Sequence, residues 1–174
     1  MADLPCLLQC CRLEELCQLA RDNVRQVSGI WVLDINDDDG RKLKNEYSRR
    51  LVPIHPVLIN RGFLQYANDK NGIGRRVFSS LRLVKTVQGA GYGNPVSSAF
   101  GRFLDKIGLT DPTLNFHSFR HTFIEAMRNA ELPYSVELAL VGHLDKHNPV
   151  HGRYGAGARV EVLAKWIEKI DPLA

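Results

Sequence analysis

The stretch GIWVLDINDDDGRKLK, residues 29–44, decides the fold class because the spacing of the apolar residues changes here. The run Ile30–Ile35 is rich in β-branched and aromatic residues, and Asp39-Gly40 is a strong signal for a tight turn. We expect a charged return strand after this turn and a third strand in RRLVPIHP, which begins at Arg49. The sequence therefore predicts a small antiparallel sheet.

Helices are predicted before and after these strands along the chain. Residues 12–20 place three leucines at intervals of three, and Pro56 can open a helix that continues to Ala67. Residues 75–86 fit either a strand or a loop, and the glycine-rich TVQGAGYGNP is interpreted as a flexible connection. Further helical spacing is found over residues 96–107, 118–130, 133–141 and about 158–170, with a loop over 142–157. The predicted fold class is α+β, mainly helical, with a small antiparallel β-sheet packed with a bundle of helices.

The composition suits a globular protein. A length of 174 residues with 44% apolar residues predicts a single domain, residues 1–174, with its own core. The apolar runs are short and no basic flank precedes an apolar block, so we expect neither a membrane span nor a signal peptide, and a cytoplasmic location. The cysteines match no zinc spacing and are predicted to be free thiols: Cys6, Cys10, Cys11 and Cys17.

Basic residues occur in two clusters, although the net charge is only +4. The first cluster opposes a single acid, Glu46, and contains Arg41, Lys42, Lys44, Arg49 and Arg50. The second has no acid among its members, which are Arg75, Arg76, Arg82 and Lys85. Such clusters suit a polyanionic partner, and a solvated basic face is the alternative interpretation.

The hexapeptide HSFRHT, residues 117–122, carries two histidines and an arginine at the start of a predicted helix. An apolar stripe of Phe119, Phe123, Met127 and Ala130 is expected to face the core. We expect the polar side chains to project together from roughly the opposite side, and these are His117, Arg120 and His121.

Two chemistries compete for this group of polar residues. The spacing of His117 and His121 can bring two imidazoles onto one zinc ion, but Ser118 stands where a zinc protease needs a glutamate. A phosphodiester is the other ligand, because the planar guanidinium of Arg120 matches two phosphate oxygens while an imidazole moves a proton. The phosphodiester interpretation requires a second guanidinium, an acid for the leaving oxygen and a nucleophile elsewhere in the chain.

These groups follow in order along the sequence. RLEE provides Arg12, LKNEYSRRLVP provides Lys44, VGH provides His143 and GRYG provides Tyr154. In these blocks the sequence resembles the catalytic domain of the tyrosine recombinases, the phage integrase family. The family pattern is an R-x-x-E helix, a hairpin lysine before a basic strand that ends in V-P, then H-x-x-R-H-[TS], G-H and a later tyrosine. The resemblance extends from Arg12 to Ile170 and implies the catalytic-domain fold of that family.

The resemblance implies in-line attack by the Tyr154 hydroxyl on a DNA phosphate, which forms a 3′-phosphotyrosyl link and frees a 5′-hydroxyl. His117 is the expected general base. The link conserves the bond energy, so no metal and no nucleotide cofactor is expected. The sequence has no phosphate loop, which agrees with this expectation.

Further roles are implied for the remaining blocks. Arg12 and Arg120 would hold the non-bridging phosphate oxygens. Lys44 would protonate the leaving 5′-oxygen, with Lys42 as the less favoured alternative. His143 would donate a hydrogen bond to the phosphate.

Double-stranded DNA is the expected partner, and the predicted DNA-binding residues are Arg41, Lys42, Arg49, Arg50, Arg75 and Arg76. The N-terminal core-binding domain of the family is expected to be absent, so DNA binding should be weak and salt-sensitive. The apolar stripe of the last helix either docks on a second protomer, giving a homo-oligomer on DNA, or packs on its own domain. A catalytically inactive DNA-binding remnant of an integrase is the alternative function, and a topoisomerase would share the same nucleophile chemistry.

Overall fold

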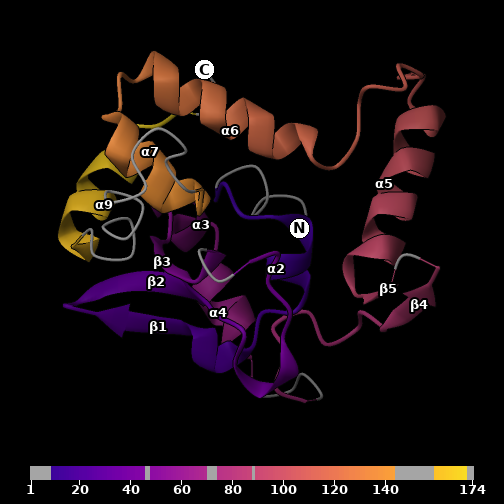
Figure 1. Cartoon of the computed structure of the whole chain (residues 1–174), viewed down its shortest axis with the longest axis horizontal. Helices are drawn as coiled ribbons and strands as arrows, with labels where there is room; N and C mark the ends of the chain where they lie inside the picture. The colour runs from indigo at the N-terminus through magenta and orange to yellow at the C-terminus, as the bar shows by residue number, and fades with distance from the viewer. Residues whose placement is uncertain (1–8, 46–47, 70–73, 88, 144–158, 172–174) are drawn as a thin grey trace.

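The computed structural model describes residues 9–45, 48–69, 74–87, 89–143 and 159–171. Within these residues, a three-stranded antiparallel sheet is covered by helices, and a long helix with a two-stranded sheet lies beside them (Figure 1). The architecture is α+β, as predicted. None of the helices in the described ranges is both long enough and apolar enough to cross a membrane.

The main sheet has the strand order β1-β2-β3, with β1 at Val24–Val27, β2 at Ile30–Ile35 and β3 at Arg50–Pro53. Each neighbouring pair is antiparallel. Ser28 and Gly29 join β1 to β2 with φ angles of 51° and 78°, the backbone of a hairpin turn whose twist matches the strands. The predicted antiparallel sheet is confirmed, and it contains an additional strand, β1, that was not predicted.

The return strand predicted directly after Asp39-Gly40 is wrong. Asp38–Gly40 form a short 3-10 turn, η2, and residues 41–45 contain no strand. The guanidinium of Arg41 donates hydrogen bonds to the side chain of Asn36, so the chain folds back on itself instead of extending the ladder. The partner of β2 is β3 instead, and the connection between these two strands carries Lys44.

The chain enters this sheet through two short helical elements. Helix α2 covers Leu13–Cys17, which is shorter than the predicted 12–20, and the 3-10 turn η1 follows at Arg21–Asn23. Between them, Ala20 forms an antiparallel β-bridge with Arg76. This bridge requires extended backbone at Ala20, which ends the helix early.

Helices α3 at Pro56–Asn60 and α4 at Phe63–Ala67 replace the single helix predicted from Pro56 to Ala67. The break lies at Gly62, whose φ of 82° is left-handed and cannot continue an α-helix. His55 precedes α3, where its Nδ1 accepts a hydrogen bond from the Val57 amide. The other ring nitrogen, Nε2, lies 2.9 Å from the carbonyl oxygen of Ile170, so the end of the chain is held against this corner.

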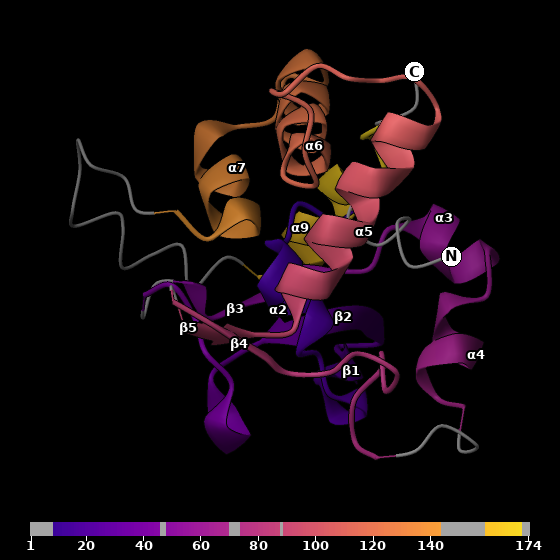
Figure 2. The ribbon, with the colours of Figure 1, turned by 90° about the vertical axis from the view of Figure 1, so that its right-hand side faces the viewer.

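The described residues of the glycine-rich segment predicted as a flexible connection belong to two strands and the start of a helix. Strands β4 at Val84–Thr86 and β5 at Gly89–Gly91 form a hairpin, and helix α5 starts at Gly93 and ends at Lys106. The carboxylate of Glu14 accepts hydrogen bonds from the amides of Tyr92 and Gly93 at 2.9 and 2.7 Å. A Cβ at Gly91 would lie 2.9 Å from this carboxylate, so glycine permits the close approach. Figure 2 shows α5 crossing the front of the molecule from this hairpin.

Three further helices complete the domain close to their predicted ranges: α6 at Ser118–Asn129, α7 at Tyr134–Val141 and α9 at Val160–Ile167. Helix α9 packs on β3, β2 and α7, and α7 also packs on β3 (Figure 1). The apolar stripe of α9 is therefore buried within its own domain, and an oligomer formed through this helix stays a prediction. Rings of Phe100, Phe116 and Phe119 join α5 to the start of α6.

Candidate functional site

Arg120 lies in the interior of the protein, which corrects its predicted place on the polar side of α6. It is only 3% exposed and shares the buried face with Phe123 and Met127. The spacing i, i+3 and i+7 explains this result, since these three residues fall on one side of a helix. His117 and His121 remain exposed, and their rings meet edge to face with centroids 4.9 Å apart.

The Arg120 guanidinium is held by main-chain carbonyls rather than by an acid. Its Nη1 donates to the carbonyl oxygen of Cys10, and its Nη2 donates to that of Val141 at 2.7 Å. No ion pair joins Arg120 to a carboxylate within the described residues. A buried charge without a counter-ion is costly, and burial lowers the pKa of this guanidinium, as do the charges of Arg12 and Arg50. The surroundings therefore favour an anionic ligand beside Arg120.

Arg12 and Arg50 share the carboxylate of Glu15. Arg12 Nη1 donates to Glu15 Oε1 at 2.7 Å, and the Arg12 amide donates to Oε2 at 2.8 Å. Arg50 Nη2 donates to Oε2 at 2.9 Å, with Nη1 3.3 Å from Oε1. Burial alone would raise the pKa of Glu15, but Arg50 and Arg12 outweigh burial and lower it. Two guanidinium groups thus share one ionised carboxylate, and the nearby Arg120 adds a further positive charge, so the centre is positively charged.

The β2–β3 connection is fixed against α2 by its polar groups. Arg12 Nη1 donates to the Ser48 hydroxyl at 3.2 Å, and Ser48 donates to Asn45 Oδ1 at 2.9 Å. The Gln18 amide side chain donates to the Lys42 carbonyl at 2.7 Å and accepts from the Lys42 amide at 2.9 Å. These bonds hold the segment that carries Lys44.

Lys44 is exposed. Its charge contributes to lowering the pKa of both His117 and His143. This proximity favours Lys44 over Lys42 as the lysine of the site.

The end of helix α7 is shaped by the two buried arginines. Arg50 Nε donates to the Leu140 carbonyl at 2.8 Å, and Arg120 binds the next carbonyl, that of Val141. The positive charges of these arginines also interact favourably with the negative end of the helix dipole. Gly142 then ends the helix with a φ of 68°, and a Cβ there would lie 2.9 Å from Arg50 Nη1. Glycine is therefore required before His143 both by the backbone and by the arginine.

His143 contacts Arg120 directly. Its Nε2 lies 3.3 Å from Arg120 Nη2, and because arginine only donates, Nε2 must accept, which puts the ring proton on Nδ1. Burial and the charges of Arg120, Arg12, Arg50 and Lys44 lower the pKa of His143 to about 4. The imidazole is therefore neutral at pH 7 and keeps one N–H to offer to a ligand.

His117 lies in the same positive field. Burial lowers its pKa first, followed by the charges of His121, Arg120, Arg12 and Lys44. A neutral imidazole can accept a proton, which a general base requires. The structure thus brings together five of the residues selected from the sequence, which are Arg12, Lys44, His117, Arg120 and His143.

Tyr154, the expected nucleophile, lies outside the described residues. Cys10, Cys11 and Cys17 are free thiols, as predicted, and Cys6 also lies outside the described residues. Burial raises the pKa of Cys10 to about 11, so its thiol stays protonated, and it lies 3.2 Å from the Leu140 carbonyl as a donor. This thiol therefore serves the packing of the site.

Arg50, predicted to bind DNA, does not lie on the surface as that role requires, because its side chain is 3% exposed and its hydrogen bonds point into the protein. Arg49 is exposed and forms ion pairs with Asp37 and Asp38. Arg75 forms ion pairs with Asp22 and Asp39, and Arg41 also reaches Asp39, at 3.6 Å. Arg76 stacks over the Tyr92 ring at 4.1 Å, and Lys42 is exposed. The surface arginines are thus largely balanced by acids.

A signal for the burial of Arg50 was present in the sequence. Side chains two apart in a strand share one face of the sheet, so Arg50 lies on the same side as Val52, which is fully buried. The exposed Arg49 precedes it with the opposite orientation. The alternation of RRLVP, combined with a buried acid in RLEE, could have predicted an internal ion pair.

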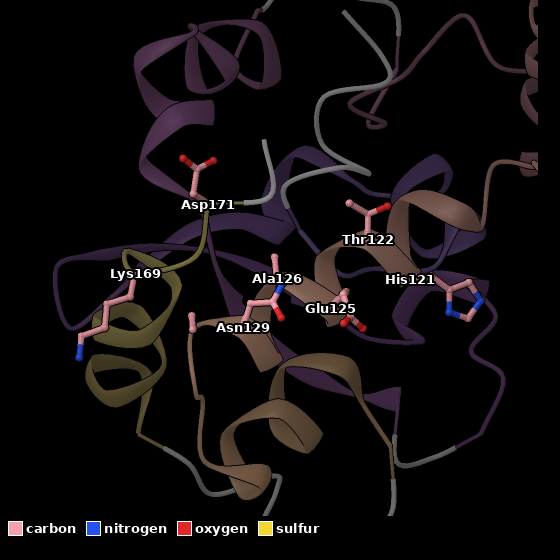
Figure 3. Close-up of a pocket in the computed structure, with 8 residues that line it drawn as sticks. His121, Thr122, Glu125, Ala126, Asn129, Lys169 and Asp171 are labelled. Carbon is pink, nitrogen blue, oxygen red and sulfur yellow. The ribbon is translucent and has the colours of Figure 1, made fainter. Parts of the chain in front are cut away.

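An open hollow lies on the other side of α6 from Arg120. Figure 3 shows His121 near one end of this hollow and Lys169 near the other, with Glu125 and Asn129 between them. The residues of α6 that line the hollow lie on the opposite side of the helix from its buried residues, Arg120, Phe123 and Met127. This hollow is therefore separate from the cluster of arginines.

Comparison of the chain with models of known protein families, with curated proteins and with solved structures finds no match. The functional interpretation therefore depends on the residues that the fold brings together. Their common property is a positive, partly buried centre with two neutral imidazoles, a lysine and hydrogen-bond donors for an anion.

Proposed function

We propose that this chain is the catalytic domain of a site-specific DNA recombinase of the tyrosine type, which cleaves and rejoins DNA through a 3′-phosphotyrosyl intermediate. The observation that carries this proposal is the convergence of Arg12, Arg120, His117, His143 and Lys44 around one positively charged centre. These residues come from four segments, with His117 and Arg120 both at the start of α6, and a phosphate is the ligand that guanidinium, imidazole and ammonium groups recognise together.

The reaction begins with attack of the Tyr154 oxygen on the phosphorus atom of one DNA strand. The new bond joins this oxygen to phosphorus, and the bond from phosphorus to the 5′-oxygen breaks. His117 takes the phenolic proton, and Lys44 gives a proton to the leaving 5′-oxygen. The reverse steps rejoin a 5′-hydroxyl to the phosphate.

The arginines supply the electrostatic part of catalysis. A tyrosine hydroxyl has a pKa of about 10, so it needs a base and a positive field to attack at neutral pH. Arg12 and Arg120 bind the non-bridging oxygens as their negative charge grows, and removal of one such donor costs about 10²–10³ in rate. The neutral His143 donates its remaining N–H to the same phosphate.

A suicide substrate tests this function. A duplex with a nick close to the cleavage position loses a short 5′-hydroxyl fragment after attack, so the covalent adduct accumulates and is seen as a slower band in a denaturing gel. A pool of nicked duplexes with randomised sequence removes the need to know the target site. Tyr154→Phe should give no adduct, whereas Tyr134→Phe, which alters a tyrosine that is 56% exposed on α7, should behave as the wild type.

The outcomes separate the two candidate functions. An adduct that depends on Tyr154 supports the recombinase chemistry. DNA binding without any adduct supports the inactive DNA-binding remnant, and an adduct that persists in Tyr154→Phe shows that another residue is the nucleophile.

A further inference from the structure

We propose that Arg50 is a positioning residue: its guanidinium holds the carboxylate that orients Arg12 and the end of the helix that carries His143. This inference rests on the proposed function, because it concerns the same phosphate site. It replaces the predicted contact between Arg50 and DNA with a role inside the protein.

The contacts of Arg50 leave it little capacity to bind DNA. Its side chain is 3% exposed, and each of its three nitrogens donates to an internal acceptor. The acceptors belong to three different segments: Glu15 in α2, Ser48 before β3 and Leu140 in α7. One side chain thus joins the segments from which the site is assembled.

The first link leads to Arg12. Arg50 binds both oxygens of Glu15, and the same two oxygens accept hydrogen bonds from the Arg12 side chain and amide. A carboxylate held at both oxygens cannot rotate. Arg50 therefore fixes the orientation of the Glu15 carboxylate, and the carboxylate in turn orients the Arg12 guanidinium. Arg12 remains 18% exposed, so it faces both this internal carboxylate and the outside.

The second link leads to His143. Arg50 Nε binds the Leu140 carbonyl, and the arginine side chain packs directly against Gly142, where a Cβ would lie 3.1 Å from its Cζ. His143 follows Gly142, so the backbone that carries the imidazole is fixed by the same guanidinium. Arg120, the second arginine proposed to bind the phosphate, donates to the adjacent Val141 carbonyl and is therefore held at the same end of α7.

The third link leads to the segment that carries Lys44. Arg50 Nη1 donates to the Ser48 carbonyl at 2.7 Å, while the Ser48 hydroxyl contacts Arg12 and Asn45. A lysine at position 50 could keep the charge but could not serve all these acceptors, because it lacks the planar fork. The geometry therefore requires arginine specifically.

The test compares two forms of the nicked duplex at saturating concentration. One form has the ordinary scissile phosphate, and in the other a methyl group replaces a non-bridging oxygen and removes the negative charge. Cleavage of the neutral form depends less on Arg12, because the charge that Arg12 binds has been removed. A substitution that acts by displacing Arg12 should therefore slow adduct formation mainly on the charged form. The variants are Arg50→Lys, Arg12→Ala and the double variant, with Leu58→Ala as a control for lost stability at a buried site in α3.

We expect Arg50→Lys to slow adduct formation on the charged form by about 10²-fold, the effect of a small misplacement of a reacting group. The loss on the neutral form should be at least tenfold smaller, and Arg50→Lys should add little to Arg12→Ala. Equal losses on both forms, as expected for Leu58→Ala, or independent losses in the double variant would overturn the proposal. If Arg50→Lys does not fold, Glu15→Gln is measured in its place.

A structural measurement keeps this inference separate from the proposed function. If wild type forms no adduct with either duplex, the recombinase function fails, and a crystal structure of Arg50→Lys decides the positioning role alone. Displacement of the Arg12 guanidinium and of His143 from their wild-type places supports the role. Unchanged contacts of Arg12 with Glu15 and Ser48 would refute it.

Discussion

Arg49 and Arg50 are adjacent in the chain and have opposite environments. Arg49 projects to the surface and pairs with Asp37 and Asp38, whereas Arg50 projects inward and pairs with Glu15. Arg49 directly precedes β3 and Arg50 is its first residue, and neighbouring side chains on extended backbone point to opposite faces. A cluster of basic residues in the sequence can therefore contain both a surface charge and a structural one.

The two environments also differ in what an ion pair contributes. Exposed pairs contribute little and can exchange one partner for a phosphate, while a buried pair is strongly coupled because a single charge cannot stay inside the protein. The surface arginines are suited to a reversible contact with an anion. The buried arginines around Glu15 and Val141 are suited to holding a site in one geometry.

The largest expected effect comes from removing one buried partner. Arg50→Met leaves the Glu15 carboxylate without its main buried counter-ion, and we expect a loss of about 3–5 kcal/mol in the free energy of unfolding. Arg49→Met should leave the stability unchanged within error. Chemical denaturation followed by circular dichroism measures both variants, and equal stabilities would contradict the contrast between the two arginines.

A second effect isolates the contact between Arg50 and the helix end. Gly142→Ala should lower the free energy of unfolding for two reasons. Alanine in a left-handed backbone costs roughly 1–2 kcal/mol, and the clash of its Cβ with Arg50 adds about 1–3 kcal/mol. Gly108→Ala is the matched control, because Gly108 has a φ of 81° with no atom within 4 Å of its Cβ position. Urea denaturation should show a larger loss for Gly142→Ala. Equal losses would mean that Arg50 moves aside freely.

The pKa of His143 should report on an anion in the site. In the free protein the pKa of His143 is lowered from 6.5 to about 4. Between about pH 4 and pH 6.5 the imidazole is therefore protonated in the unfolded chain but neutral in the folded chain. This contribution to stability is complete above pH 6.5 and is lost as the pH falls towards 4. Inorganic phosphate should raise the pKa of His143, since a nearby negative charge favours the imidazolium.

Nuclear magnetic resonance of the His143 ring, titrated with and without phosphate, measures this shift. Arg49→Met should show the same shift as wild type, because Arg49 is exposed and pairs with Asp37 and Asp38. A pKa that phosphate leaves unchanged would argue against an anion site beside Arg120.

The smallest effect concerns the surface pairs. Asp37→Asn with Asp38→Asn frees Arg49 for a phosphate, so DNA affinity should rise roughly two- to fivefold at low salt. The slope of log affinity against log salt should steepen by about 0.9 for one added phosphate contact. Asp105→Asn with Asp111→Asn removes the same charge elsewhere and should leave the slope unchanged. Fluorescence anisotropy at several salt concentrations measures both, and identical slopes would place Arg49 away from DNA.

Much of the local structure was accessible from the sequence because it depends on short-range patterns. The helices at Ser118–Asn129 and Tyr134–Val141 follow the apolar period, and β2 follows its β-branched run. The start of α5 in the glycine-rich segment was not predictable from local pattern, because Glu14, a carboxylate 78 residues away from Tyr92 in the chain, accepts the hydrogen bond of the Tyr92 amide. Strand β1 was missed because its formation depends on pairing with β2.

The residue types of the site were determined by the sequence itself: an arginine with a glutamate one turn later, a histidine with an arginine three residues later, and a glycine before a histidine. Only the tertiary structure decided that Arg120 and Arg50 lie inside, that Glu15 serves two arginines and that both arginines hold the end of α7. The physical reason is that the partner of a buried charge is chosen by which segments meet in space. Spacing along the chain fixes the face of a helix or strand, but the carbonyls and carboxylates that face it come from elsewhere in the fold.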